Sequence, residues 1–237
     1  MYIDWTYIVL VLPAVIFSLA MSALVNSSFK KYSSVLSYRG VTAADAARRV
    51  LESNGVSGVT FERVAGNLTD HYDPRTNVIR LSDGVYSNTS VAAIGVACHE
   101  AGHAVQYAKG YAPIKFRAAI IPITNIGSKL SIPLIILGIA LSYMGEIFTM
   151  IAYIGVALYG LCVLFQLATL PTEFNASRRA LESIKSCNIL SADELVGAKK
   201  VLSAAAMTYV AALAVSLANL LRLFILVNGS NRIELKG

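Results

Sequence analysis

Charged residues are scarce in this 237-residue chain. Only 14% of its residues are charged and 56% are hydrophobic, which gives a mean hydropathy of +0.61. Ordinary soluble domains carry about 25% charged residues. A soluble fold could not bury that much apolar surface, so part of the surface must face lipid. The composition therefore excludes an ordinary soluble protein.

Cysteine is also rare, and the basic residues do not form a patch with interleaved aromatic residues. Cys98, Cys162 and Cys187 are an odd number at spacings that fit no disulfide framework and no zinc ribbon. Cys98 adjoins His99 but points about 100° away from it on a helix, which disfavours it as a metal ligand. The net charge of +6 comes from residues that follow the ends of apolar segments, so we expect no nucleic-acid partner.

Long apolar stretches are abundant and predict four membrane spans. The first stretch lacks a basic start and is longer than the apolar core of a signal peptide, which indicates a retained anchor. Pro122 and Pro133 are expected to kink or break the approach to the second span. The predicted organisation is a first span at 1–26, a soluble segment at 27–117, a hairpin of two spans at 118–171, a polar helical segment at 172–204, a fourth span at 205–228 and a tail at 229–237.

Lys and Arg residues predict the orientation of these spans. Seventeen of the 20 lie in the two segments 27–129 and 172–204, which therefore face the cytoplasm by the positive-inside rule. The sequence thus predicts a multi-pass protein of the cell membrane, with the lipid bilayer as a partner and its soluble parts on the cytoplasmic side.

The segment 27–117 has the pattern of a small α+β domain. Thr42 and Asp45 form a capping box that opens a helix. Alternating residues at 59–64 and 77–81 predict two strands, with a turn at 73–76 before the second. Small apolar residues without turn signals predict a buried helix at 90–109.

The predicted buried helix carries the residues Cys-His-Glu-Ala-Gly-His-Ala at 98–104. His99 and His103 are four residues apart, so both imidazoles share one helix face and can bind one metal ion. Glu100 lies close enough to take a proton from a water molecule at that ion, as a general base does. Zinc is the ion that such a site favours, with an expected stoichiometry of one per chain.

A catalytic zinc needs a third protein ligand. Glu146 and Glu234 are predicted on the opposite side of the membrane. Glu173 directly follows the third span and opens a polar helical segment, where N-terminal amides would keep its carboxylate ionised. Glu182 and Glu194 are the alternatives.

The chain resembles the YugP-type neutral zinc metallopeptidases of bacterial membranes over nearly its full length. The resemblance rests on Asp70–Thr76, the motif at His99–His103 with its flanks, and Leu170–Ser177. A weaker likeness links the chain to the HtpX heat-shock proteases and the CAAX prenyl proteases. The resemblance implies a gluzincin-like site with Glu173 as third ligand. Those relatives have an Asp shortly after this Glu, whereas Asn175 and Ser177 stand here, which leaves the partners of the histidines open.

His71 is the remaining histidine and precedes the predicted turn. A strand beside it could pair with an extended peptide, and His71 would then stabilise the oxyanion. Tyr72 is placed similarly, and a simple surface role for His71 is equally compatible with the sequence.

The sequence therefore predicts a mainly α integral membrane protein with four transmembrane helices and a small cytoplasmic zincin-like domain. Its expected activity is that of a zinc metalloendopeptidase that cleaves peptides, membrane proteins or segments near the bilayer, with Glu100 as the base. A zinc-containing membrane scaffold without activity is the alternative, and a small transporter is a further one. The sequence leaves a membrane-protein partner and a homo-oligomer open.

Overall fold

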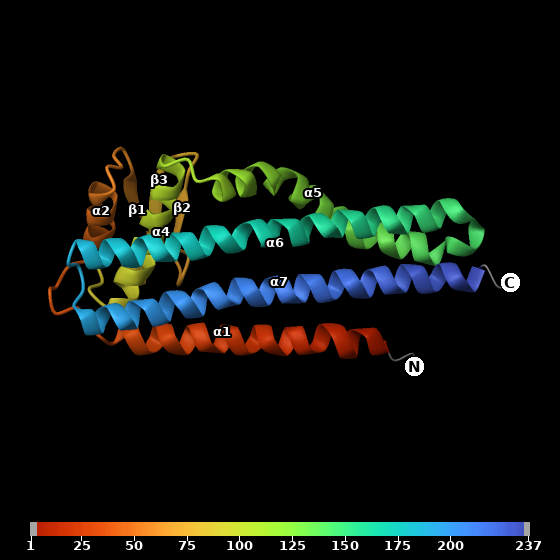
Figure 1. The fold of residues 1–237 in the computed structure, drawn as a ribbon, viewed down its shortest axis with the longest axis horizontal. Coiled ribbons are helices and arrows are strands. Elements are labelled where there is room, and N and C mark those ends of the chain that lie inside the picture. The colour runs from red at the N-terminus through yellow and green to blue at the C-terminus, as the bar shows by residue number, and fades with distance from the viewer. Residues whose placement is uncertain (1–3, 235–237) are drawn as a thin grey trace. The chain divides into compact units, whose positions relative to one another are not determined.

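The computed structural model describes residues 4–234 and divides the chain into two compact units. The first unit comprises the described parts of Met1–Ala20, Phe116–Thr169 and Tyr209–Gly237, and the second comprises Met21–Lys115 and Leu170–Thr208. Figure 1 shows the chain with its elements labelled. The elements outside the small sheet and its neighbours are a π-helical turn η1 (Tyr7–Val11), α1 (Leu12–Ser33), α5 (Ala112–Ala140), a 3-10 turn η2 (Ser142–Met144), α6 (Glu146–Ser186) and α7 (Ala192–Glu234).

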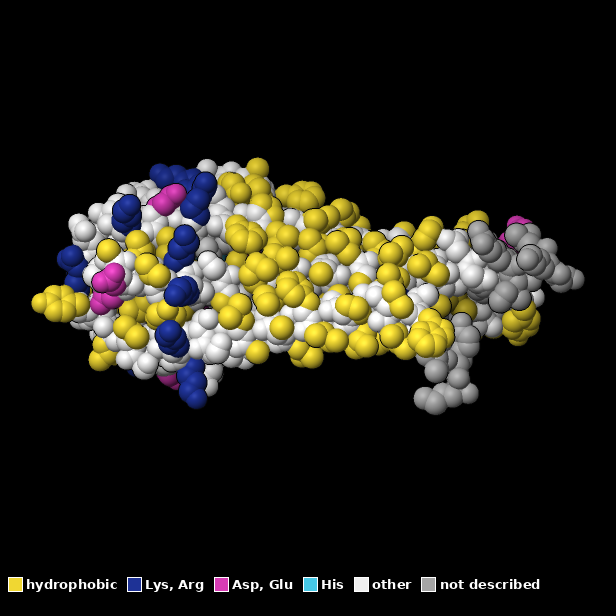
Figure 2. Space-filling view, turned by 60° about the horizontal axis from the view of Figure 1, so that its bottom comes forward, with side chains coloured by type: hydrophobic (Ala, Val, Ile, Leu, Met, Phe, Trp, Pro, Cys, Tyr) yellow, Lys and Arg dark blue, Asp and Glu magenta, His cyan; other side chains and the backbone are white. Residues whose placement is uncertain are grey.

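Within residues 4–234, four helices are long and apolar enough to cross a membrane, and their number equals that of the predicted spans. They are Tyr7–Ser33, Ala112–Ala140, Glu146–Ser186 and Ala192–Gly229. In the first unit, large hydrophobic side chains such as Ile136, Ile147 and Met150 are more than 60% exposed, as expected where lipid replaces water. Figure 2 shows a broad expanse of hydrophobic side chains, with the Lys and Arg side chains gathered elsewhere on the same face.

Prolines interrupt the helices less than the sequence suggested. Helix α5 contains both Pro122 and Pro133, and it changes direction along its length without ending (Figure 1). Helix α6 continues through Pro171. The prediction that Glu173 lies beside the N-terminal amides of a new helix is therefore wrong, because Glu173 is in the interior of a 41-residue helix. Neighbouring helices and local adjustments allow such prolines in membrane helices.

Close helix packing and an ion pair between Asp4 and Arg222 contribute to holding the first unit together. A Cβ atom at Gly138 of α5 would lie 2.5 Å from the backbone oxygen of Phe148, so only glycine lets α5 and α6 approach this closely. Arg222 of α7, to which the sequence assigned no role, donates to the Asp4 carboxylate at 2.9 Å and 2.5 Å. Arg222 therefore holds Asp4 against α7.

The second unit contains a three-stranded sheet with the order β1-β3-β2. Strands β1 (Thr60–Val64) and β3 (Val78–Ser82) are parallel, with Thr60 opposite Val78. They correspond to the two predicted strands. Strand β2 (His71–Asp73) pairs antiparallel with β3, with Tyr72 opposite Ile79. The sequence did not predict β2 as a strand, because three residues next to a turn carry no alternation of apolar and polar side chains.

Helix α4 (Val91–Ala108) lies in the core of the second unit and corresponds to the predicted helix at 90–109. It packs against α2 (Ala43–Ser53) and directly against β2 and β3, and the short helix α3 (Asp83–Tyr86) contacts both α4 and the sheet. The Thr42 hydroxyl caps α2 by accepting from the Asp45 backbone N–H at 3.2 Å, as predicted. The two helices pack closely because the residues between them are small; those buried on α2 are Ala43, Ala44, Ala46 and Ala47.

Candidate metal centre

Helix α4 places both histidines and Glu100 next to one another. It begins at Ser90, whose hydroxyl accepts from the Ala93 backbone N–H, and it continues without interruption past the motif. The rings of His99 and His103 lie 4.7 Å apart at an angle of 84°. The spacing of four residues therefore puts both imidazoles on one face, as predicted.

Gly102, inside the motif, allows α6 to reach this face. A Cβ atom at this position would lie 2.6 Å from the backbone oxygen of Ala176. The backbone of α6 thus touches α4 where a side chain would otherwise stand. Glu173 lies one turn before Ala176 on α6 and is only 3% exposed beside the histidines.

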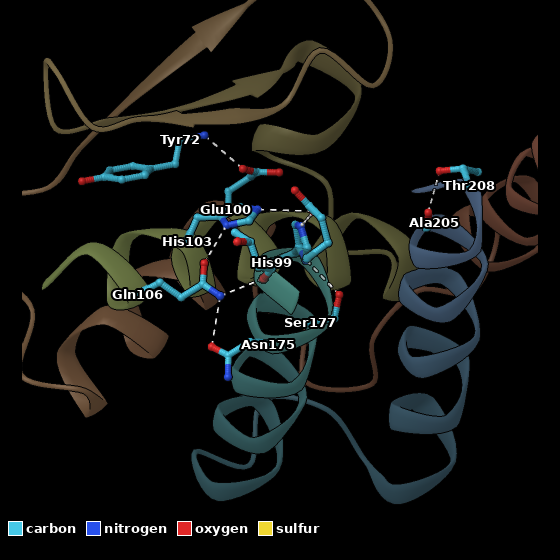
Figure 3. A network of polar contacts seen from close by, with 11 residues as sticks. Tyr72, His99, Glu100, His103, Gln106, Asn175, Ser177, Ala205 and Thr208 are labelled. Carbon is cyan, nitrogen blue, oxygen red and sulfur yellow. Dashed lines mark hydrogen bonds and ion pairs between the residues drawn. The ribbon is translucent and has the colours of Figure 1, made fainter. Parts of the chain in front are cut away.

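The three predicted ligands converge. One ligand atom each from His99, His103 and Glu173 lie within 4.8 Å of one another. Glu173 Oε2 is 3.2 Å from His99 Nε2 and 3.6 Å from His103 Nε2. Figure 3 shows His99 and His103 side by side on α4. Glu182 and Glu194, the alternatives for the third ligand, lie elsewhere: Glu182 is exposed beside Arg178, and Glu194 accepts from the backbone of Tyr38 and Ser191.

The second nitrogen of each imidazole has its own partner. His103 Nδ1 is 3.0 Å from Gln106 Oε1, and His99 Nδ1 is 3.1 Å from Ser177 Oγ (Figure 3). Gln106 Nε2 donates to the Thr172 backbone oxygen at 2.7 Å and to Asn175 Oδ1 at 3.0 Å. Because its amide nitrogen is used in this way, Gln106 presents its oxygen to His103. His103 Nδ1 must therefore carry the proton, which leaves Nε2 free to bind a metal.

These contacts answer the question that the sequence left open. Ser177 supports His99 directly, and Asn175 supports His103 through Gln106 and is itself fixed by Arg179 at 2.7 Å. Gln106 was missed by the sequence reasoning. A polar residue in an otherwise apolar helix, three positions after His103, was the available signal, and its side chain is fully buried.

The charges at the site favour a cationic ligand. Burial lowers the pKa of His103, but the hydrogen bond to Glu173 and the charges of Glu100 and Glu173 outweigh that effect and raise it. The carboxylates that stabilise a positive charge on protonated His103 would also stabilise a metal cation at the same place.

Glu100 is tied to the edge of the sheet. Its Oε2 accepts from the backbone N–H of Tyr72 at 3.0 Å (Figure 3), and the residue as a whole is 8% exposed. The Tyr72 ring lies 5.7 Å from that of Tyr107, and its hydroxyl donates to Asn77 Oδ1. Asp70, just before β2, accepts from the Ser82 backbone N–H at the end of β3, and burial raises the pKa of its carboxyl. These contacts hold β2 beside α4.

Comparison with known proteins agrees with this geometry. Residues 7–228 match the family described as "Putative neutral zinc metallopeptidase". The chain belongs to this family. It is also 47% identical over 206 residues to the "Putative membrane protease YugP" of Bacillus subtilis (strain 168), covering 86% of this chain and 89% of that protein. No solved structure is significantly similar to the chain.

The zinc that the family description implies fits the residues present. Two imidazole nitrogens and one carboxylate oxygen are the ligand set of many catalytic zinc sites, and three protein ligands leave a position open. Both histidines are oriented by hydrogen bonds on the far side of their rings, as metal-binding histidines usually are. His99, His103 and Glu173 would hold the ion.

Two other residues singled out from the sequence do not join this cluster. Cys98 is fully buried, and burial raises the pKa of its thiol, so it is a neutral core residue. His71 is exposed on β2, and its Nδ1 lies 2.8 Å from the Thr69 backbone oxygen. A role for His71 as oxyanion stabiliser stays a prediction.

Proposed function

We propose that this protein is a membrane zinc endopeptidase in which Glu100 is the general base. The observation that supports the proposal is the position of Glu100, on the same helix as two histidines whose Nε2 atoms converge with Glu173. A structural metal site has no need of a carboxylate held beside it. A zinc ion, when bound, polarises the carbonyl of the substrate and makes water acidic enough to be deprotonated near neutral pH.

Glu100 is suited to move the proton. Its Oε2 is oriented by the Tyr72 amide, which leaves the other carboxylate oxygen available to the attacking water. Glu100 takes the proton of that water and then transfers it to the leaving amine. Because Glu100 is largely removed from solvent, the proton stays within the site between the two steps.

The substrate is proposed to be an extended peptide that pairs with β2. Strand β2 lies at the edge of the sheet, and the Tyr72 backbone N–H points away from β3 toward Glu100. The outer edge of β2 therefore borders the metal centre. Because Glu100 holds the Tyr72 N–H, a substrate strand added there would use the remaining outward backbone groups of β2, which places its peptide bond near Glu100. The four candidate spans and the membrane protease to which the chain is similar favour substrates in or near the bilayer.

The site is proposed to face the cytoplasm. The second unit carries most of the Lys and Arg residues of the chain, and cytoplasmic segments are enriched in them. Alkaline phosphatase fused after residue 237 should be active outside the cell, and the same reporter within 187–191 should be inactive. The reverse pattern would place the site on the outer face.

Metal content and proteolysis, measured together on the detergent-purified full-length protein, test the proposal. The wild type and Glu100→Gln should each hold about one zinc ion per chain, and only the wild type should cleave fluorescently labelled casein. Glu173→Ala should lose the zinc. Zinc retained by Glu173→Ala would assign the third ligand elsewhere, with Glu182 or Glu194 tested next.

Two results would contradict the proposal. A folded wild type that takes up no zinc from excess would leave a membrane scaffold as the better account. Equal proteolysis by the wild type and by Glu100→Gln would exclude Glu100 as the base.

A further inference from the structure

Helices α6 and α7 of the second unit enclose a groove of about 410 Å³. Most of its lining is apolar and comes from Phe174, Leu181, Leu195, Leu202 and Ala206. Phe174, which lines the groove, is 48% exposed. The groove is separate from the metal centre, although Ser177 lines it and also contacts His99.

Cationic side chains border this apolar groove. Arg178, Lys185 and Lys199 line it together with a single acidic residue, Glu182. Arg178 Nε is 3.9 Å from Glu182 in a pair that is more than two-thirds exposed, so this contact neutralises little. Within the described part of the chain, neither Lys185 nor Lys199 has a carboxylate within ion-pair distance. The groove therefore presents net positive charge beside apolar surface.

The charged residues of the lining lie toward one end of the groove, interspersed with Leu181 and Leu195, and the other end is uncharged. The two helices are joined by residues 187–191 and run antiparallel, so residues near 186 and 192 lie at the connected end. Lys185 is one residue from the end of α6, whereas Phe174 and Ala206 lie more than two helical turns farther along their helices. The ligand that matches this arrangement has an anionic head toward the connection and an apolar chain directed away from it.

We propose that the groove binds one anionic phospholipid, with its phosphate near Lys185 and Lys199 and an acyl chain along Phe174 and Ala206. An acidic peptide would match the charges equally well. A lipid matches better because both helices that line the groove are also candidate membrane spans, so an acyl chain can follow them. This inference does not depend on the proposed peptidase activity.

Native mass spectrometry of the full-length protein in detergent tests the proposal, with phosphatidylglycerol and phosphatidylcholine of identical acyl chains as probes. We expect one phosphatidylglycerol to bind at least about tenfold more tightly than phosphatidylcholine, since each basic residue near an anionic lipid contributes about fivefold. The triple variant Arg178→Gln, Lys185→Gln, Lys199→Gln should lose this preference. A control with the same change of charge at three other exposed positions should keep it: Arg49→Gln, Arg75→Gln, Lys109→Gln.

A second variant tests the apolar part of the groove. Ser203 is exposed and lines the groove, so Ser203→Trp fills the space without changing the charge. It should weaken phosphatidylglycerol binding by at least about tenfold, and it keeps the test valid if the triple variant fails to fold. Thermal melting of each variant in detergent checks the fold.

Four outcomes would overturn the proposal. They are equal binding of the two lipids, an equal loss in the groove and control triple variants, full binding by Ser203→Trp, and displacement of phosphatidylglycerol by polyglutamate or by glycerol phosphate at the lipid's own concentration. The last would show that the groove recognises an acidic peptide or a phosphate without an acyl chain.

Discussion

Replacing Gly102 by alanine is expected to disrupt the metal centre without touching any ligand. The new Cβ atom would lie 2.6 Å from the Ala176 backbone oxygen. Reaching an ordinary contact of 3.4 Å requires α6 to move by about 0.8 Å. Glu173 is one turn away on α6 and would move with it. Metal–ligand distances tolerate only about 0.2 Å, so the shift exceeds what the site can absorb.

The expected cost has two parts. Overpacking of this kind lowers the free energy of unfolding by about 1–3 kcal/mol. Replacing glycine by alanine inside a helix raises it by about 1 kcal/mol. Gly102→Ala should therefore lose up to about 2 kcal/mol of stability and bind zinc at least about tenfold more weakly. Thermal melting in detergent and competition with a chromophoric zinc chelator measure the two effects.

Gly95, on the same helix, provides the matched control. A Cβ atom there would meet Ala198 Cβ at 3.6 Å, an ordinary contact. Gly95→Ala should leave zinc binding unchanged and keep or slightly raise the melting temperature. If Gly102→Ala bound zinc as tightly as the wild type does, the close approach of α6 to α4 at this glycine would not be what positions Glu173.

Three further predictions concern the neighbourhood of the site and the fold of the second unit. Gln106→Leu removes the acceptor for His103 Nδ1 and should lower zinc affinity about 10–100-fold, measured by chelator competition. Because the pKa of His103 is raised, its proton should compete with zinc at and above pH 6.5, so apparent affinity should rise with pH across that range in an equilibrium titration. An affinity independent of pH between 6 and 8 would contradict this. Thr42→Ala removes the cap of α2 and should cost about 1 kcal/mol, seen as a lower melting temperature, whereas Thr42→Ser should preserve it.

The spans, the motif helix and the helix cap were predictable because each depends on residues close together in the sequence. An apolar stretch of sufficient length predicts a span wherever it occurs. The four-residue spacing of His99 and His103 fixes their common face once α4 is a helix. The Thr42 cap likewise needs only Asp45, three residues away.

Local rules were misleading where the tertiary structure overrides them. The change from apolar to polar residues after the third span indicated that a separate helical segment opens at Glu173, but α6 runs through this position. Strand β2 is too short to show a period, and it exists because β3 and Glu100 offer partners to its backbone. Neither effect is visible in a window of neighbouring residues.

The sequence by itself determined four helices long and apolar enough to span a membrane, and a pair of histidines and a carboxylate on one further helix. Several carboxylates remained possible as third ligand, and topology with resemblance favoured Glu173. Only the tertiary structure decided which groups surround the histidines. Glu173 and Ser177 reach His99 from a helix more than 60 residues away in sequence, and Gln106, on the same helix as the histidines, is oriented by Thr172 of that distant helix. Such contacts depend on how closely the backbones of α4 and α6 approach each other. They can approach this closely because Gly102 has no side chain.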